Sequence, residues 1–359
     1  MNIVISGYYG SKNGGDEAML AAMLEVLRDE IPDLHATVIS INPEYTRRRH
    51  NVDAVERPDI RTIIKKIRAA DLLISGGGSL LQNVTSGRSL YYYLAIIFFA
   101  LIFGRKVMLY AQGIGPVRGT MARKLMNVIL NRVDLITVRD RGSLKELERL
   151  QITRPKIFCT ADPVLALKPA SLDLGEKILA RHGISRDGKF IGVAIRHWLD
   201  WENFSRELAA SLDRLADDAK IIFLPMKFPE DIRAAQSTAA LMKSPCTVLD
   251  EEFSTREILS LVGCMDVLIG VRLHALIFAG VMGVPMLGIS YDPKIERFLD
   301  SIGEKPLGTL RDVTATEIFD ATLKKLRTPK ISRDVNLLRE LGDLARLNAK
   351  LAAELLGGA

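Results

Sequence analysis

The chain has 359 residues, of which 48% are hydrophobic and 26% are charged, and its formal net charge at pH 7 is +6. This length predicts two domains rather than one, and the composition excludes a largely disordered chain. With 6% aromatic residues and no basic run interleaved with aromatic side chains, nucleic acid is a poor candidate partner. The positive charge instead favours a phosphorylated substrate or an anionic membrane surface.

The cysteines and the first residues bear on the cellular compartment. Cys159, Cys246 and Cys264 are widely spaced in apolar segments and form no C-x-x-C pair. This pattern favours buried, reduced thiols over disulfides and offers no metal site. The chain begins directly with the strand-like segment 2–7, without the charged and apolar regions of a signal peptide. We therefore expect a cytoplasmic protein.

Short β-branched segments alternate with segments of helical spacing along most of the chain. Helical spacing is clear at Asp16–Glu30 and Thr120–Asn131. The segments predicted to be strands are 2–7, 35–41, 71–78, 106–113, 134–140, 156–162, 190–196, 220–226, 246–250, 266–272 and 286–290. This alternation indicates βαβ units and an α/β fold with parallel sheets.

The alternation pauses at Asp162–Gly175, which contains two prolines and which we interpret as a linker. We predict two Rossmann-like domains, residues 1–168 and 169–330, that face each other across a cleft. A C-terminal helix, residues 331–359, is expected to pack back on a domain surface. Open parallel sheets bind ligands beyond the carboxyl ends of their strands, so the loops that follow strands are the best candidates for a site.

The longest apolar stretch, Leu90–Phe103, is shorter than the roughly 20 residues that span a bilayer. It predicts a buried helix of the first domain. The alternative is a helix that dips into a membrane surface beside the basic residues at Gly104–Lys106. Two basic runs, Thr46–His50 and Lys65–Arg68, are interpreted either as solvated faces or as contacts for a diphosphate or the membrane surface.

Three glycine-rich loops follow predicted strands of the first domain. The first contains Asn13 and Asp16, and Asp16 is either an ordinary acid at the start of a helix or a base for a sugar hydroxyl. The second, Gly76–Gly78, precedes Ser79 and an expected helix, and it is either a tight turn or a set of backbone amides that face a ligand. The third loop carries Gln112. The candidate contacts to an acceptor substrate in these loops are Asn13, Asp16, Gly77, Ser79 and Gln112.

Cationic side chains stand at the ends of other predicted strands. Arg139 is expected to face either an anionic ligand or a structural partner, Asp140 or Asp162. Arg196 and His197 end the first predicted strand of the second domain. We assign these two residues as further candidate contacts to the acceptor.

The strongest pattern is the R-L-H string at Arg272–His274, which is followed by Lys294 after the next predicted strand. A guanidinium, an imidazole and an ammonium group at the carboxyl edge of adjacent strands suit a small ligand that bears a carboxylate and a phosphate. A single histidine is more often an ordinary core residue. The matching positions of Arg272 and Lys294 nevertheless favour a site.

Together these residues resemble a known family, the polysaccharide pyruvyltransferases, and most closely its CsaB-type members, which modify cell-wall polymers. The matching strings between Asn2 and Lys294 are NGGDEAM, ISGGGSLLQ, QGIGP, TVRDRGS, ADP, VRLHALIFAGVMGVP and YDPK, in this order. The resemblance implies a two-domain fold similar to GT-B glycosyltransferases, with phosphoenolpyruvate as co-substrate and without a metal or other cofactor. It also implies that Arg139, His274 and Lys294 hold phosphoenolpyruvate, and the cation pattern adds Arg272.

In the expected reaction, His274 protonates the enol carbon or the leaving phosphate, Asp16 is the base for an acceptor hydroxyl, and a pyruvate ketal forms. By analogy with the family, the acceptor is an amino sugar of a cell-envelope polysaccharide, free or linked to a lipid diphosphate. The enzyme would then work in the cytoplasm, with peripheral contact to the membrane. Two other functions stay open: a GT-B glycosyltransferase that uses a nucleotide sugar, and a non-catalytic protein that binds sugars or anions. Only the latter would tolerate loss of His274.

Overall fold

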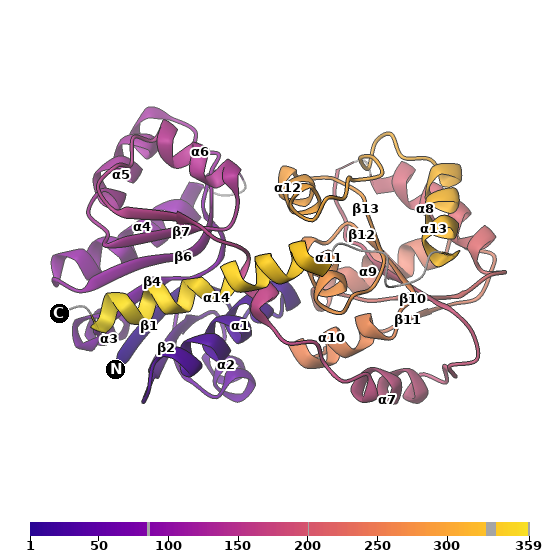
Figure 1. Ribbon diagram of the computed structural model, residues 1–359, viewed down its shortest axis with the longest axis horizontal. Coiled ribbons are helices and arrows are strands. Elements are labelled where there is room, and N and C mark those ends of the chain that lie inside the picture. Colours follow the sequence, from indigo (N-terminus) through magenta and orange to yellow (C-terminus); the bar gives the residue numbers. More distant parts are fainter. Residues whose placement is uncertain (85–86, 200, 328–334, 358–359) are drawn as a thin grey trace. The chain divides into compact units, whose positions relative to one another are not determined.

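The computed structural model describes residues 1–84, 87–199, 201–327 and 335–357. The chain forms two compact units, which are coloured along the sequence in Figure 1. Unit 1 comprises Met1–Ser11, Asp16–Ala166 and Glu340–Ala359, and unit 2 comprises Lys12–Gly15 and Leu167–Arg339. These units depart from the predicted ranges 1–168 and 169–330 because the chain passes through unit 2 early, at Lys12–Gly15.

Unit 1 is built on an eight-stranded sheet in the order β3-β2-β1-β4-β6-β7-β8, with β5 paired to β6. Its strands are β1 (Asn2–Tyr9), β2 (His35–Ser40), β3 (Asp53–Glu56), β4 (Leu72–Ser75), β5 (Gly78–Leu81), β6 (Lys106–Ile114), β7 (Leu135–Val138) and β8 (Lys156–Cys159). All neighbouring strands are parallel. Every residue of β4 and β7 is buried, as expected for strands inside a parallel sheet. The strands therefore end at one edge of the sheet, where the candidate loops lie.

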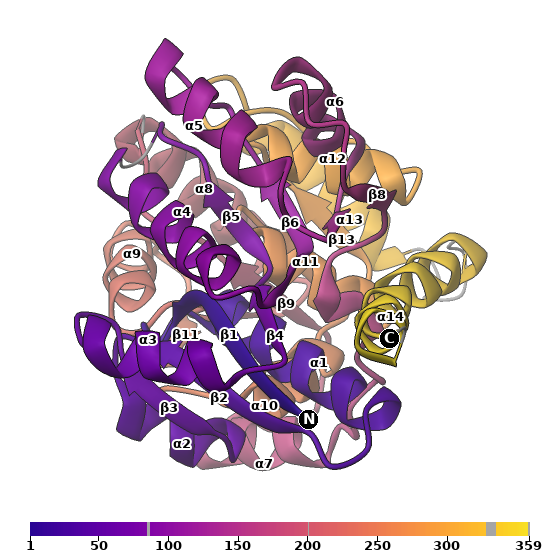
Figure 2. The same cartoon turned by 90° about the vertical axis from the view of Figure 1, so that its left-hand side faces the viewer.

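The helices of unit 1 connect and cover these strands. They are α1 (Gly14–Glu30), α2 (Pro43–His50), α3 (Ile60–Ala69), α4 (Gly87–Ile102), α5 (Thr120–Leu130), α6 (Arg141–Arg149) and the short 3₁₀ helix η1 (Pro163–Ala166). Figure 2 shows α3, α4 and α5 next to one another, with α4 in the middle. Helix α4 packs Leu90, Tyr93 and Ile97 into the core of the unit, so the interpretation of Leu90–Phe103 as a buried helix is correct for one side of the helix only.

The C-terminal helix α14 (Val335–Gly357) packs on unit 1 with its second part. The Lys106 ammonium donates to the Leu355 carbonyl at 2.9 Å. The Thr160 hydroxyl donates to Asn348 Oδ1 at 2.8 Å, and both of these side chains are buried. Of the predicted helix 331–359, residues 331–334 and 358–359 lie outside the described residues.

Unit 2 contains a five-stranded parallel sheet in the order β11-β10-β9-β12-β13. Its strands are β9 (Phe190–Ala194), β10 (Lys220–Phe223), β11 (Cys246–Val248), β12 (Val267–Gly270) and β13 (Met286–Gly288). Its helices are α7 (Asp173–Arg181), α8 (Trp201–Leu215), α9 (Glu230–Ala239), α10 (Thr255–Gly263), α11 (Leu273–Val281), α12 (Pro293–Ser301) and α13 (Ala315–Arg327). Both units alternate strands and helices, and the predicted α/β fold with parallel sheets is confirmed.

The structure corrects one local prediction on the chain path of unit 1 and bears out another. The residues after Gly76–Gly78 form strand β5 rather than a helix, because Leu81 pairs with Ile114 of β6, and the next helix begins only at Gly87. The predicted linker Asp162–Gly175 contains the boundary between the two units, which lies between Ala166 and Leu167. The linker is therefore confirmed, although its first part forms the buried helix η1.

The predicted burial of the cysteines is only partly correct. The thiol-bearing residues are all free, but Cys159 is exposed, Cys246 is half-buried and only Cys264 is buried. Cys159 ends β8, which is the last strand of its sheet and has three exposed positions out of four. A strand at the edge of a sheet has a neighbouring strand on one side only, so the other side is open to solvent. The apolar sequence around Cys159 therefore did not imply that this cysteine is buried.

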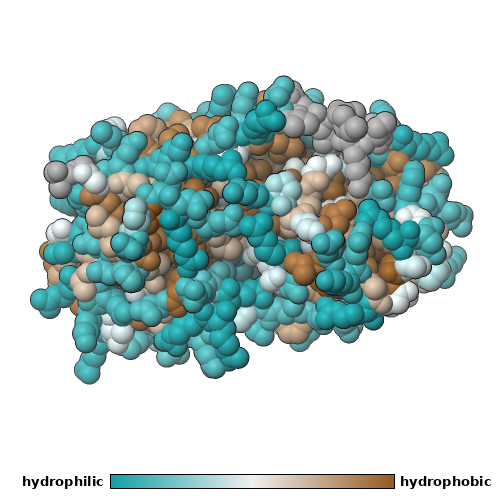
Figure 3. Space-filling view, turned by 60° about the horizontal axis from the view of Figure 1, so that its bottom comes forward, coloured by the Kyte–Doolittle hydropathy of each residue, from teal (hydrophilic) through white to brown (hydrophobic). Residues whose placement is uncertain are grey.

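Among the described residues, no helix combines the length and the apolar character that crossing a bilayer would need. The face of the molecule in Figure 3 is mainly hydrophilic, and smaller hydrophobic areas appear between the polar side chains.

Candidate functional site

The guanidinium of Arg139 lies at the carboxyl edge of the unit 1 sheet, in contact with Asp162 and Ser79. Arg139 Nη1 is 2.7 Å from Asp162 Oδ2, and Nη2 donates to the Ser79 hydroxyl at 3.2 Å. The side chains of Arg139 and Asp162 are 7% and 6% exposed. Asp140 instead caps α6 by accepting from the Ser143 amide. The interpretation of Arg139 as one half of an internal ion pair is therefore confirmed, with Asp162 as the partner.

Gln112 holds the glycine-rich turn of unit 1 through its side-chain amide. The residue is fully buried. Its Oε1 accepts from the Ser75 hydroxyl at 3.1 Å, and its Nε2 donates to the Gly78 carbonyl at 2.7 Å. Both ends of the amide thus hold the glycine-rich turn between β4 and β5 in place. These bonds use one N–H and one acceptor position of the amide, and the predicted contact of Gln112 with an acceptor stays a prediction.

The glycine turn lies beside Asp16 and a buried tyrosine that the sequence analysis did not single out. A Cβ atom on Gly78 would stand 3.7 Å from Asp16 Oδ1, and one on Gly76 would stand 2.1 Å from the Tyr9 hydroxyl oxygen. Within the described residues, the Tyr9 hydroxyl has no hydrogen-bond partner. Burial raises the pKa of Tyr9 well above its usual range, and the nearby charge of Asp16 raises this pKa further. Gly76 is therefore required for close packing against Tyr9.

Gly77 is another packing position, because a Cβ atom there would meet Met19 Sδ at 3.1 Å and Pro163 Cγ at 3.4 Å. Ser79, in contrast, is exposed at the edge of the sheet. Of the predicted residues of unit 1, Ser79 and the half-buried Asp16 stand at this edge, and the Arg139 guanidinium reaches it through its contact with Ser79.

In unit 2, the segment Lys12–Gly15 packs against the loop after β10 and is hydrogen-bonded to it. The Gly14 amide donates to the Met226 carbonyl at 2.6 Å. Asn13 pairs with Lys227 in an isolated antiparallel bridge, and its Oδ1 accepts from the Gly15 amide at 3.2 Å. A Cβ atom on Gly15 would stand only 2.1 Å from His274 Nδ1. The glycines of this segment thus allow the backbone to lie directly against the imidazole of His274.

Arg272 is held in a buried ion pair with Asp231. Arg272 Nε donates to Asp231 Oδ2 at 2.9 Å, and Nη2 donates to Oδ1 of the same carboxylate. Asp231 also accepts from the amides of Met226 and Lys227, at 3.1 and 2.9 Å. Arg272 therefore stabilises the loop that holds Gly14, and its predicted direct contact with phosphoenolpyruvate stays a prediction.

A second cluster surrounds Tyr291, which the sequence analysis also missed. Arg196 Nη1 donates to the Tyr291 hydroxyl at 3.1 Å, and the Arg196 guanidinium carbon lies 4.8 Å from the centroid of the Trp198 ring. Lys294 Nζ lies 5.5 Å from the centroid of the Tyr291 ring and 3.4 Å from Asp292 Oδ2. The structure thus brings together Arg196, predicted for the acceptor, and Lys294, predicted for the donor.

The remaining predicted residues are placed as follows. His197 is exposed and contacts the Trp201 ring in a tilted arrangement, with the ring centroids 4.5 Å apart. Arg139 belongs to unit 1, whereas His274 and Lys294 belong to unit 2. The convergence of these three side chains in one interdomain pocket therefore stays a prediction.

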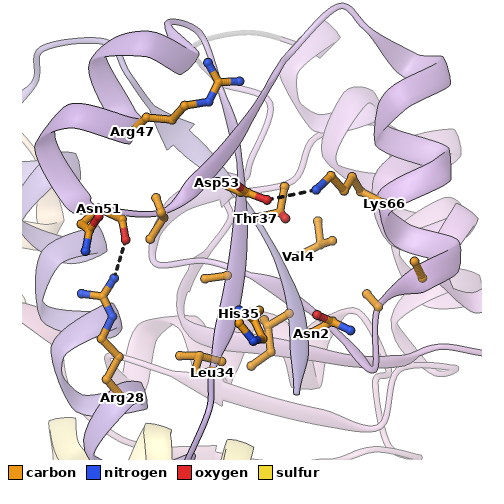
Figure 4. Close-up of a pocket in the computed structure, with 15 residues that line it drawn as sticks. Asn2, Val4, Arg28, Leu34, His35, Thr37, Arg47, Asn51, Asp53 and Lys66 are labelled. Atoms are coloured by element: carbon orange, nitrogen blue, oxygen red, sulfur yellow. Dashed lines mark hydrogen bonds and ion pairs between the residues drawn. The ribbon is translucent and has the colours of Figure 1, made fainter.

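A cavity of about 540 Å³ in unit 1 lies at the opposite, amino ends of β1, β2 and β3 (Figure 4). Its cationic side chains are engaged within the unit: Arg28 donates to the Asn51 carbonyl, Arg47 to the Ala54 carbonyl, and Lys66 pairs with Asp53. The interpretation of the basic run Thr46–His50 as a solvated face is partly wrong, because Thr46 and His50 are buried.

The contact between Gly15 and His274 predicts the effect of one added methyl group. Gly15→Ala should displace the imidazole, because a Cβ atom cannot stand 2.1 Å from Nδ1. The free energy of unfolding should fall by about 1–3 kcal/mol, because the added methyl overpacks a buried position. The expected result is a shifted imidazole resonance of His274 in NMR spectra and a lowered midpoint of urea unfolding. An unchanged resonance would contradict the contact.

Solved structures with the same fold act on sugar nucleotides or transfer sugars. The UDP-GlcNAc 2-epimerase of Methanocaldococcus jannaschii matches with a TM-score of 0.68 and 13% identity, over 97% of this chain and 99% of that chain. Alr3699/HepE of Anabaena, solved in complex with UDP-glucose, matches with a TM-score of 0.65 and 12% identity, over 100% of both chains. Identities this low show the fold alone. The class of the protein is therefore the GT-B-like α/β fold.

The chain belongs to the polysaccharide pyruvyl transferase family, whose model matches residues 13–293. One relative is the amylovoran biosynthesis protein AmsJ of Erwinia amylovora, which is 22% identical over 308 residues. The match covers 80% of this chain and 66% of AmsJ, so this chain spans slightly less than two thirds of that relative's length. The family match includes the predicted site residues from Asn13 to His274, and Lys294 stands one position beyond its end.

Proposed function

We propose that this protein transfers the pyruvyl group of phosphoenolpyruvate to two hydroxyl groups of a sugar in polysaccharide biosynthesis. The observation that carries the proposal is the family match over residues 13–293. In this reaction both hydroxyl oxygens bond to C2 of the enol, C3 gains a proton to become a methyl group, and the bond from C2 to the phosphate oxygen breaks. Of the two protons that the hydroxyl groups lose, one equals the proton gained by C3 and the other leaves with phosphate. The acceptor is proposed to be an amino sugar, free or linked to a lipid diphosphate.

The charges of the donor decide which cations suit it. Phosphoenolpyruvate carries a carboxylate and a phosphate, so it needs cations whose charge is not already cancelled. Arg139 and Arg272 each face a close carboxylate. Arg196 has no carboxylate partner within the described residues. Lys294 faces Asp292 at 3.4 Å, but these side chains are 29% and 36% exposed, so solvent screens this pair far more than the buried pairs of Arg139 and Arg272. We therefore place Arg196 with Lys294 on the donor side of the proposed site.

The proton transfers are assigned to His274 and Asp16. His274 is the second residue of α11, and its imidazole is fixed by the backbone at Gly15. An imidazole exchanges protons near neutral pH and can protonate C3 or the leaving phosphate. Asp16 lies beside the glycine turn of unit 1 and is the proposed base for an acceptor hydroxyl. Arg272 contributes indirectly. Its guanidinium pairs with Asp231, Asp231 accepts from the Met226 amide, and the Met226 carbonyl accepts from the Gly14 amide.

Binding of phosphoenolpyruvate alone tests the donor assignment, because no acceptor is needed. We expect saturable binding by isothermal titration calorimetry. Lys294→Ala and Arg196→Gln should each raise Kd by about 10-fold or more, since a hydrogen bond to a charged group contributes roughly 1.5–3 kcal/mol. Lys243→Ala is the matched control, because Lys243 is exposed elsewhere in unit 2. Phosphate release is then measured with purified amino-sugar acceptors.

Two outcomes would replace the proposal. Saturable binding of UDP or a UDP-sugar, with no binding of phosphoenolpyruvate, would indicate nucleotide-sugar transfer. Binding of phosphoenolpyruvate without phosphate release for any acceptor would indicate a non-catalytic anion-binding protein.

A further inference from the structure

Helix α4 presents an apolar stripe to solvent. Its exposed residues recur at every third or fourth position and therefore form one line along the helix. This α4 stripe consists of Arg88, Tyr91, Ala95, Phe98 and Ile102. Tyr91, Phe98 and Ile102 are 45%, 48% and 58% exposed. The solvent side of a helix on a globular protein is ordinarily polar, so a long apolar stripe indicates a surface that meets another apolar phase.

The two neighbouring helices surround the α4 stripe with positive charge. Helix α4 lies between α3 and α5 in both ribbon views (Figures 1 and 2). Helix α5 extends the apolar surface with Met121 and Val128, which are 72% and 42% exposed. The three helices contain no aspartate or glutamate. Their basic residues are Arg61, Lys65, Lys66, Arg68, Arg88, Arg123 and Lys124.

We propose that the exposed face of α3, α4 and α5 docks on the surface of an anionic phospholipid bilayer. The α4 stripe would enter the boundary between headgroups and acyl chains, and the basic side chains of α3 and α5 would meet the lipid phosphates. Basic and aromatic groups already lie together here: the Arg68 guanidinium carbon is 5.4 Å from the centroid of the Phe103 ring, and that of Arg57 is 4.3 Å from the centroid of the Tyr92 ring. Long basic side chains can rest on apolar surface while their charged ends stay in the headgroup layer.

The packing of α4 determines how deep this contact goes. The opposite side of the helix places Leu90, Leu94 and Ile97 in the core of unit 1. Because these side chains hold the helix on the sheet, α4 lies along the bilayer surface and contributes only its stripe. The predicted alternative, a helix at Leu90–Phe103 that touches a membrane, is thus combined here with the buried helix that the structure shows.

Charge favours a bilayer over a second copy of this chain as the occupant. Two copies that met through this face would bring the basic residues of α3 and α5 of each copy against those of the other. Such like-charge contacts are unfavourable, and no acidic residue of these helices could compensate them. An anionic lipid surface supplies both the apolar phase and the opposite charge.

Sedimentation with lipid vesicles tests the docking face on the whole protein. We expect wild-type protein to bind vesicles that contain phosphatidylglycerol in phosphatidylcholine, and to bind more weakly as salt is raised. The double variant Phe98→Gln/Ile102→Gln should weaken binding more than about 10-fold, because it removes the exposed apolar side chains. Lys65→Glu/Lys124→Glu should weaken binding by about 10-fold or more, because each basic residue near an anionic surface contributes roughly 5-fold.

Matched controls lie on unit 2. Leu174→Gln/Leu241→Gln replaces two equally exposed apolar residues, and Lys177→Glu/Lys243→Glu makes the same change in net charge. Both control proteins should bind vesicles like wild type, and all variants should keep wild-type phosphoenolpyruvate binding. The docking face does not depend on the proposed reaction, so the two can fail separately.

The proposal is overturned if wild-type protein does not bind the anionic vesicles, or if the face variants and the controls lose binding equally. It is also overturned if light scattering shows a wild-type dimer that Phe98→Gln/Ile102→Gln converts to a monomer while vesicle binding stays unchanged. That result would assign the α4 stripe to contact between copies.

Discussion

His274→Ala is expected to lower the rate of phosphate release from phosphoenolpyruvate by about 10²- to 10⁴-fold, the usual contribution of a positioned general acid. Within unit 2 the imidazole lies against the backbone of Gly15, at the start of α11. A group held in this way is oriented before substrate binds, which is the arrangement that proton transfer requires. The measurement is kcat for phosphate release with saturating phosphoenolpyruvate and an active acceptor.

The effect should appear in kcat more than in binding. If His274 mainly transfers a proton, Kd for phosphoenolpyruvate should change much less than kcat in His274→Ala. His35→Ala is a suitable control, because His35 is exposed at the amino end of β2. A wild-type kcat in His274→Ala would remove the histidine from the mechanism, and an equal loss in kcat and affinity would assign it to binding.

Asp231→Ala is expected to lower the free energy of unfolding by about 3–5 kcal/mol, because it leaves the buried guanidinium of Arg272 without its counter-ion. The Asp231 and Arg272 side chains are 1% and 11% exposed. The variant also removes the acceptor for the amides of Met226 and Lys227, so the loop that seats Gly14 should loosen. Urea unfolding followed by circular dichroism measures the first effect, and phosphate release measures the second.

A double variant separates the lost pairing from the lost side chain. Asp231→Leu/Arg272→Met removes both charges, and it should be more stable than Asp231→Ala, since replacing a buried ion pair by apolar groups is often close to neutral. Asp217→Ala, at an exposed position of unit 2, should change stability by less than about 0.5 kcal/mol. If Asp231→Ala were as stable as Asp217→Ala, the pair with Arg272 would not be a significant stabilising contact.

Regular elements were largely predictable, because their signal is local. The apolar runs that became β4 and β12 are continuous, and every residue in both strands is buried. The elements that were missed lack such a signal. β3 has the sequence DAVE and β5 has the sequence GSLL, so neither segment shows a run of β-branched residues. In both cases pairing with a neighbouring strand determines the conformation.

The sequence by itself determined the alternation of strands and helices, the family, and which polar residues stand after strands. Only the tertiary structure decided which groups these residues contact. Arg139 meets Asp162 at a separation of 23 residues, Arg272 meets Asp231 at 41, and Arg196 meets Tyr291 at 95. The physical reason is that a strand end is specified by its own residues, whereas the partner of a buried charge depends on which distant segments the fold brings together.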